Sequence, residues 1–334
     1  MIINHWYIAL ESEKLKSKPL SCTILEETIV LFRNSNKEVS ALLNRCPHRN
    51  VYLSKGKIKD GNIQCPYHGW EFNKKGECVK IPSLCHAQKI PPNSSVKNFP
   101  VMEQDDYIWV WIGDREPQEN EKPFKIPNYK VECWGNKRFS VEINNNIDNI
   151  TENFIDTTHT GYIHKGLFRN EAEHIAKNHL EIIEDGVIIN IEEEETSNSI
   201  LGKLLLGDSK PIHQDRFIMP SIVQVSYSFG EERKMSTSHI LTPIDKNKTK
   251  IYLIFSYKFG IMNPLLSMLS PLFSKLIIEQ DKEILNHQGS ITKYGEKYAS
   301  VISDTANIWI RNFKQKSSDG LREDFKTKDI NFKL

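Results

Sequence analysis

The chain has 334 residues, enough for two ordinary domains, and its 44 basic and 43 acidic side chains leave a net charge of +1. Its 39% hydrophobic and 26% charged residues predict a folded protein, and the lack of a basic stripe argues against a nucleic-acid partner. The first ten residues have neither a cationic start nor a small-residue cleavage site, so we expect a first strand rather than a signal peptide.

The longest apolar region, residues 263–278, is interrupted by Pro264, Pro271 and Lys275. We therefore expect it to be too short and too broken to span a membrane, and we expect no membrane partner. The six cysteines show no repeating spacing and no secretory context. Those outside the motif described below are expected to be buried or half-buried free thiols in a reducing cytoplasm. They are Cys22, Cys78, Cys85 and Cys133.

Residues 1 to about 115 predict a run of short strands separated by polar turns. The last of them, Tyr107–Ile112, alternates Tyr107, Trp109 and Trp111 on one face, which favours packing on a core. The other strands are expected at 23–25, 28–32, 39–43, 62–64, 70–72 and 101–103.

Within this region lies a C-x-H pair, sixteen further residues, and then a C-x-x-H pair. The residues are Cys46, His48, Cys65 and His68. Two thiolates and two imidazoles can hold a [2Fe–2S] cluster with the cysteines on one iron and the histidines on the other. Zinc is the alternative, although zinc fingers usually place their two cysteines together and their two histidines together.

The stretches CPHRN, LSKGKI and CPYHGWEF resemble the N-terminal domain of the Rieske non-haem iron oxygenases. The Rieske proteins of respiratory and photosynthetic complexes are less similar, because they carry a second cysteine in each loop where this chain has Val51 and Tyr67. Asn50 stands where the oxygenases often have glycine. Asparagine also tolerates a left-handed backbone, so we expect the loop to be kept.

Residues 113–127 are rich in Pro, Glu and Lys and are expected to connect two domains. Beyond them, Leu180–Ile191 predicts a hairpin with Asp-Gly at its tip, and 192–195 a solvated strand end. The tail from Lys316 is charged, with little to bury. Further strands are expected at 222–229, 239–242 and 251–259, and a helix at 272–288.

A second constellation reads Asp156-x-x-His159-x4-His164. Two histidines and one carboxylate on one face of Fe(II) form a facial triad with open positions for O₂ and substrate. On an ideal helix His159 and His164 would lie about 140° apart, so they share a metal only if the helix breaks between them. Gly161 permits such a break.

The resemblance implies that the third iron ligand is an aspartate on a helix near the C-terminus. Asp281 is the expected ligand because it follows an apolar stripe and an inward-facing acid needs a partner. Glu279 and Glu283 are competitors on the same helix.

The same resemblance gives roles to two residues before the first histidine. Asp156 would bridge the two metal centres, contacting the iron-ligand histidine and a cluster histidine of the neighbouring subunit. Asn153 matches a position near the iron, with Glu152 and Asp148 as alternatives.

The family's architecture implies an α+β chain. An all-β Rieske domain over 1–115 would precede a helix-grip, START-like catalytic domain over 116–334, with an antiparallel sheet and a C-terminal helix. Head-to-tail homotrimers would bring the cluster of one subunit to the iron of the next. We expect the pocket walls at 222–229, 239–255 and 201–206. His239 either lines the pocket or is a satisfied strand histidine.

The implied function is that of a terminal oxygenase component, a monooxygenase or dioxygenase that hydroxylates or oxidatively demethylates a small organic substrate with O₂. The chain lacks a G-x-G-x-x-G turn and a plant-type cluster motif, so its electrons are expected from NAD(P)H through a separate reductase, with or without a ferredoxin. That partner would dock near His48, His68 and Trp70. The alternative is a Rieske electron-transfer or redox-sensing protein.

Overall fold

The computed structural model describes all residues except 1, 86, 166–174, 193–210, 289–297 and 322–323. Its contacts divide the chain into two compact units. One holds residues 3–125 with the short segment 242–245, and the other holds residues 126–241 and 246–334.

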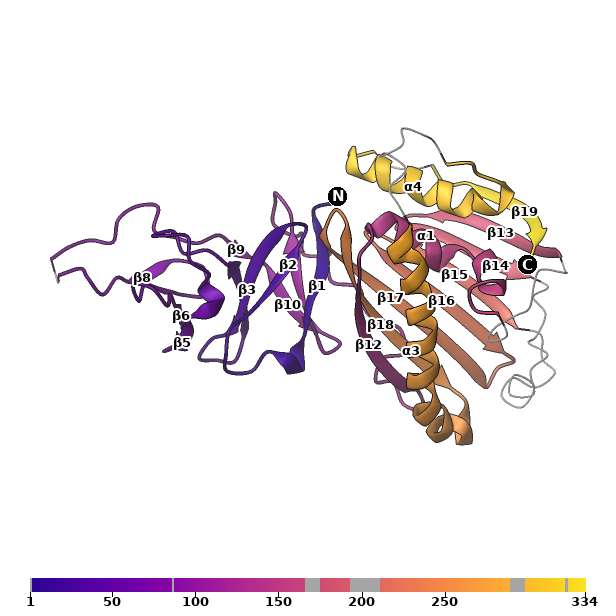
Figure 1. Ribbon diagram of the computed structural model, residues 1–334, viewed down its shortest axis with the longest axis horizontal. Coiled ribbons are helices and arrows are strands. Elements are labelled where there is room, and N and C mark those ends of the chain that lie inside the picture. The colour runs from indigo at the N-terminus through magenta and orange to yellow at the C-terminus, as the bar shows by residue number, and fades with distance from the viewer. Residues whose placement is uncertain (1, 86, 166–174, 193–210, 289–297, 322–323) are drawn as a thin grey trace. The chain divides into compact units, whose positions relative to one another are not determined.

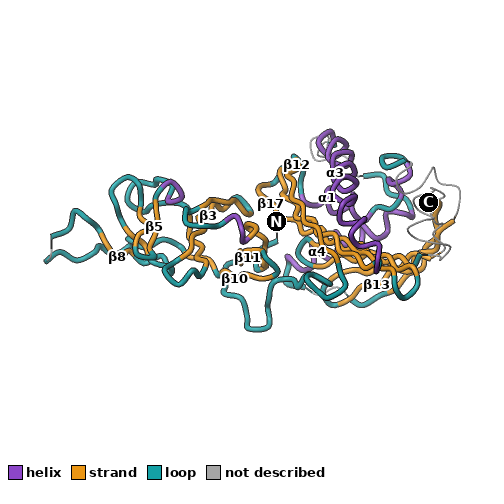
Figure 2. Tube along the Cα trace, turned by 90° about the horizontal axis from the view of Figure 1, so that it is seen from below, coloured by secondary structure: helices purple, strands orange, loops and turns teal. Residues whose placement is uncertain are grey.

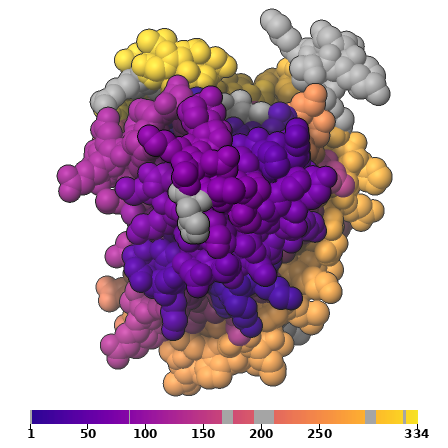
Figure 3. Space-filling model, turned by 90° about the vertical axis from the view of Figure 1, so that its left-hand side faces the viewer, coloured from indigo at the N-terminus to yellow at the C-terminus, as the bar shows by residue number. Residues whose placement is uncertain are grey.

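The N-terminal unit is built from three small antiparallel sheets, and Figure 3 shows its surface in indigo and purple. Strand β11, Tyr107–Ile112, is buried at all six positions because aromatic and β-branched side chains fill the core on both faces. The sheets are β1-β11-β10, β2-β3-β4-β9 and β5-β6-β7-β8. Their strands are β1 (His5–Glu11), β2 (Leu20–Ile24), β3 (Glu27–Arg33), β4 (Val39–Leu43), β5 (Lys57–Lys59), β6 (Asn62–Gln64), β7 (Glu71–Phe72), β8 (Cys78–Lys80), β9 (Asn98–Phe99), β10 (Val101–Gln104) and β11.

The C-terminal unit is one eight-stranded antiparallel sheet with helices packed on it (Figures 1 and 2). The predicted hairpin is confirmed, since Ile183 pairs with Gly186 across the turn at Asp185. In spatial order the strands are β12 (Gly135–Ile143), β18 (Lys248–Lys258), β17 (Arg233–Asp245), β16 (Ile222–Phe229), β15 (Ile212–Ile218), β14 (Gly186–Glu192), β13 (Ile175–Ile183) and β19 (Thr327–Lys333).

Within the described part of the unit, three α-helices pack on this sheet. Helix α1 (Ile147–Ile155) is capped by Asn146, whose side chain accepts a hydrogen bond from the backbone N–H of Asn149. Helix α4 (Thr305–Ser318) buries Trp309, Ile310 and Phe313 in a cluster with residues of β13 and β14. Helix α3 (Asn263–His287) lies in front of the strands in Figure 1.

The apolar region 263–278 was expected to be broken by its prolines, with a helix only from 272. Instead it is part of one continuous helix, α3, which begins at Asn263. Pro264 lies in the first turn, where a missing N–H costs nothing, and the helix continues through Pro271. By length and composition alone, Gly260–His287 is the one stretch of the described residues that could cross a membrane. Asp281 and Leu285 of this helix are nevertheless buried within the unit.

The charged tail was also predicted wrongly. Residues from Thr327 form the edge strand β19, which pairs with β13 from Thr327 to Lys333. Ile330 and Leu334 enter the largest core cluster of this unit, so the tail does bury apolar surface. Of the predicted solvated strand end 192–195, Glu192 is exposed, and the remainder lies outside the described residues.

Candidate metal centres and active-site cavity

Four residues of the C-x-H and C-x-x-H pairs lie in two loops beside the β5–β8 sheet. Cys46 and Cys65 are buried and belong to a cluster with Leu53, Ile63 and Phe72. Each loop closes on itself: the N–H of Asn50 donates to the Cys46 carbonyl, and that of Gly69 to the Cys65 carbonyl. Asn50 has φ 54°, so the asparagine adopts the left-handed backbone that its position requires.

The two imidazoles of this motif lie beside each other, with ring centroids 4.5 Å apart for His48 and His68. Trp70 stacks on His48 at 4.7 Å. Nδ1 of His48 is covered and has no hydrogen-bond partner among the described residues. Burial raises the pKa of the Cys46 thiol to about 11, so its thiolate needs a cation. An orphaned ring nitrogen and a buried thiol pair fit an iron–sulfur cluster held by these four residues.

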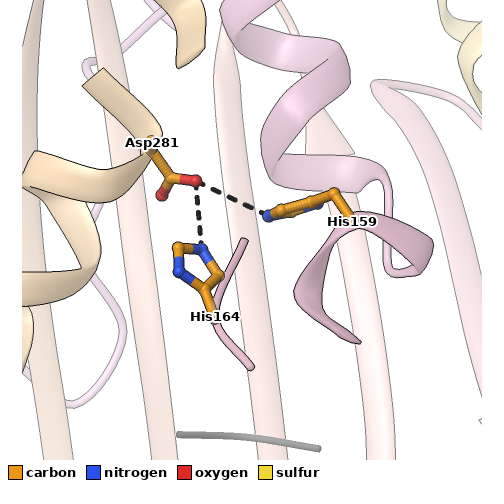
Figure 4. Close-up of side chains that lie close together, drawn as sticks. All are labelled: His159, His164 and Asp281. Carbon is orange, nitrogen blue, oxygen red and sulfur yellow. Dashed lines mark ion pairs between the residues drawn. The ribbon is translucent and has the colours of Figure 1, made fainter. Parts of the chain in front are cut away.

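The second centre is made by His159, His164 and Asp281, whose ligand atoms all lie within 4.8 Å of one another (Figure 4). Nε2 of His164 is 3.0 Å from Oδ1 of Asp281, and Nε2 of His159 is 3.6 Å from the same oxygen. His159 and His164 are not on one continuous helix. Helix α1 ends at Ile155, and a short 3₁₀ helix, Thr158–Gly161, follows it and brings the two imidazoles together. The three groups could therefore share one metal ion.

Hydrogen bonds determine which nitrogen of each imidazole faces Asp281. Nδ1 of His159 lies 2.5 Å from the carbonyl oxygen of Asp156, and Nδ1 of His164 lies 2.9 Å from Oε1 of Gln280. Both partners can only accept, so both Nδ1 atoms carry the proton and both Nε2 lone pairs are left for a metal. Gln280 was missed in the sequence; only its position next to Asp281 could have indicated it.

Burial is the largest influence on both pKa values. It lowers the pKa of His159, which favours the neutral ring that a metal requires. For His164 burial acts in the same direction, but the hydrogen bond to Asp281 and its negative charge prevail and raise the pKa. A divalent cation among the three groups would replace the proton that His164 shares with Asp281.

Burial separates the candidate acids of α3. Asp281 is 3% exposed and faces the two histidines, whereas Glu279 and Glu283 are exposed on the opposite side of the helix. Nδ2 of Asn153 lies 3.5 Å from Asp281 Oδ1, which places this amide beside the triad. The alternatives Glu152 and Asp148 instead form ion pairs with residues of α4, namely Arg311 and Lys314.

Asp156 lies next to the triad, but its carboxylate does not bond His159 within the chain. Oδ1 accepts hydrogen bonds from the backbone N–H and the hydroxyl of Thr158, at 2.8 and 2.6 Å. It is the backbone carbonyl of Asp156 that meets His159. The carboxylate therefore holds the turn that presents the first histidine.

The triad opens into a cavity of about 290 Å³ between the sheet and α3. Its walls include parts of the predicted strands 222–229 and 239–255, and His239 lines it; the predicted loop 201–206 lies outside the described residues. Helix α3 contributes a wall that the sequence did not suggest. Its lining residues are Leu266, Leu269, Ser270, Phe273, Ser274, Ile277, Ile278 and Asp281.

Comparison with known proteins decides between the two functional interpretations. A model of the Rieske [2Fe–2S] domain matches residues 5–100, and one of the vanillate O-demethylase oxygenase C-terminal domain matches residues 143–317. The oxygenase component of dicamba O-demethylase from Stenotrophomonas maltophilia is 30% identical over 300 residues, covering 84% of this chain and 86% of that protein. The chain belongs to the Rieske non-haem iron oxygenase family.

Further comparisons agree with this assignment. The 3-chlorobenzoate-3,4-dioxygenase oxygenase subunit of Comamonas testosteroni is 32% identical over 167 residues, which cover 48% of this chain and 38% of that protein. A crystal structure of dicamba monooxygenase bound to dicamba has the same fold, with a TM-score of 0.83 at 23% identity, over 96% of this chain and 98% of that one.

The oxygenase is thus an enzyme with a Rieske [2Fe–2S] domain and a catalytic domain with a candidate iron site. This assignment excludes zinc in the first motif and electron transfer as the sole function. The dicamba protein is named as an oxygenase component and the chlorobenzoate protein as an oxygenase subunit.

Proposed function

We propose that the oxygenase hydroxylates or oxidatively demethylates a small organic substrate in the cavity beside Fe(II) held by His159, His164 and Asp281. When bound, iron supplies the site of O₂ activation and the cluster, held by Cys46, His48, Cys65 and His68, supplies electrons one at a time. The observation that carries the proposal is the shared orientation of both Nε2 atoms toward Asp281 at the cavity wall. Residues 1–115 would form the cluster domain and 116–334 the catalytic domain.

Neighbouring residues would keep these ligands in position. Gln280 and the Asp156 carbonyl orient the two imidazoles, and Asn153 donates to Asp281. The cavity, largely walled by apolar side chains, would bury the substrate and exclude water from the reacting position.

We further propose a homotrimer in the cytoplasm, in which the Asp156 carboxylate meets the cluster domain of a neighbouring subunit. Its partial exposure and its place beside His159 support this role. The reductase would dock at the exposed side of the cluster loops, where His68 and Tyr67 are open to solvent. Among the cysteines outside the cluster motif, Cys22 and Cys78 are half-buried as expected. Cys85 and Cys133 are exposed, so the expectation of burial is wrong for these two.

The test is turnover by the iron- and cluster-loaded protein with a surrogate reductase, NADH and a panel of aryl methyl ethers. We expect substrate-dependent O₂ uptake and oxygen from ¹⁸O₂ in the products. His159→Ala should abolish product while the reductase still reduces the cluster, and Glu283→Gln, an exposed acid on the same helix, should behave as the parent. Product formation undiminished in His159→Ala would reject the proposed iron site.

A further inference from the structure

A second polar group lines the cavity apart from the metal triad. His213 and Asp215 are two residues apart on β15, so both point to the same face of the sheet. Nε2 of His213 lies 2.9 Å from Oδ1 of Asp215. Tyr227, the cross-strand partner of His213, stacks on its ring at 4.1 Å. All three residues line the cavity.

Both members of this pair are buried, with His213 2% and Asp215 1% exposed. An ionised carboxylate can accept about four hydrogen bonds, and burying it with fewer is costly. Among the described residues, the Asp215 carboxylate has His213 as its single side-chain partner. Because Asp215 lines the cavity, a ligand there can donate the further hydrogen bonds that this carboxylate can accept.

A further buried polar residue lines the same cavity. His239 is 7% exposed, and its Nδ1 has no hydrogen-bond partner among the described residues. The cavity is therefore built for a molecule that carries polar groups and not for a plain hydrocarbon.

The charge of the lining indicates which polar group is accepted. The Asp215 carboxylate gives this pair a hydrogen-bond acceptor at the cavity, and its partner is a single imidazole. The described lining residues include Asp156, Asp215 and Asp281 but no lysine or arginine. Among the described lining residues an anionic substrate would find no side-chain cation, whereas a cationic group would be matched by carboxylates.

We propose that Asp215, positioned by His213, binds a protonated amine of the substrate, with Tyr227 providing an aromatic surface for the cation. The inference rests on the proposed function, because it names the substrate class of the same cavity. Relatives named for 3-chlorobenzoate and toluene-4-sulfonate act on anions. This oxygenase would differ from them in the charge of its substrate.

The test compares two probes of similar size and opposite charge, 4-methoxybenzylamine and 4-methoxybenzoate, by anaerobic calorimetric titration of the loaded oxygenase. We expect the amine to bind at least about ten-fold more tightly, as one charge-assisted hydrogen bond would give. Asp215→Asn should weaken amine binding by about the same factor.

The matched control is Asp329→Asn, because Asp329 forms a similar pair with His179 on the same sheet, 2.6 Å apart, but is 84% exposed and outside the cavity lining. It should leave both affinities unchanged. Equal affinities, a preference for the benzoate, undetectable amine binding, or equal effects of the two substitutions would overturn the inference.

Iron content separates this inference from the proposed function. If the protein binds iron and turns over ethers but does not bind the amine more tightly than the benzoate, only the proposed cation site is rejected. One that prefers the amine but binds no mononuclear iron rejects the oxygenase proposal alone. If Asp215→Asn does not fold, the amine-to-benzoate ratio of the unsubstituted protein still decides the question.

Discussion

At the scale of single residues, the candidate iron site depends on backbone turns as much as on ligand identity. His159 and His164 are too widely spaced for one helical face, and the Thr158–Gly161 turn brings them together. Gln280, one residue before Asp281, orients His164 from the opposite side. The ligand set is thus held by residues of two separate segments.

Gln280→Ala should weaken iron binding at the triad by about ten- to a hundred-fold, the usual cost of losing a hydrogen bond to a ligating histidine. The measurement is Fe(II) titration of the cluster-loaded protein under anaerobic conditions. Glu279→Ala, an exposed neighbour on the same helix, serves as the control. Identical affinities in the two variants would show that Gln280 does not position His164.

His5 predicts an acid-sensitive N-terminal unit. Burial lowers its pKa to about 4, with Glu121 opposing and Arg115 adding to the shift. Below the unfolded pKa of about 6.5, the unfolded chain binds a proton at this histidine that the folded chain does not. Stability should therefore fall as the pH drops from about 6.5 to 4.

The variant His5→Gln should flatten this pH dependence. The thermal midpoint for loss of the visible cluster absorption is measured from pH 7.5 to 5, with His287→Gln, an exposed histidine, as the control. An unchanged slope in His5→Gln would assign the acid sensitivity to another group.

At the scale of elements, the tail strand β19 completes the edge of the catalytic sheet. Ile330 is 4% exposed and packs in the cluster of β13, β14 and α4. This cluster joins β19 and α4 to the sheet. The stability of the catalytic unit therefore depends on the C-terminal strand, although its charge had suggested a solvated tail.

Ile330→Ala should lower the free energy of unfolding by about 2–4 kcal/mol, the range for a buried aliphatic residue truncated to alanine. Chemical denaturation followed by tryptophan fluorescence measures the change. Lys328→Ala, an exposed position of the same strand, should cost less than about 0.5 kcal/mol. A loss below 1 kcal/mol in Ile330→Ala would show that β19 contributes little.

Two of the elements that the sequence missed share a cause. Strand β15 reads IHQDRFI and helix α1 reads IDNITENFI, so polar residues interrupt the apolar periodicity of both. In β15 two of the polar residues, His213 and Asp215, line the cavity and are buried from solvent. Candidate metal ligands could be proposed from the sequence because ligand chemistry restricts their types and spacing, whereas cavity-lining polar residues obey no such pattern.

At the scale of the whole molecule, the two metal-binding motifs lie in different compact units. Cys46, His48, Cys65 and His68 belong to the N-terminal unit, and the triad belongs to the C-terminal one. Each unit has its own core clusters. Substitution in one centre should therefore leave the metal content of the other unchanged.

The most direct measurement is iron and acid-labile sulfide per chain in anaerobically purified protein, with EPR after reduction. Three irons, two sulfides and a Rieske-type signal are predicted, falling to two irons with the same signal in Asp281→Ala. Two irons and two sulfides in the unsubstituted protein, with added Fe(II) bound no better than by Asp281→Ala, would contradict the account of this chain as an oxygenase.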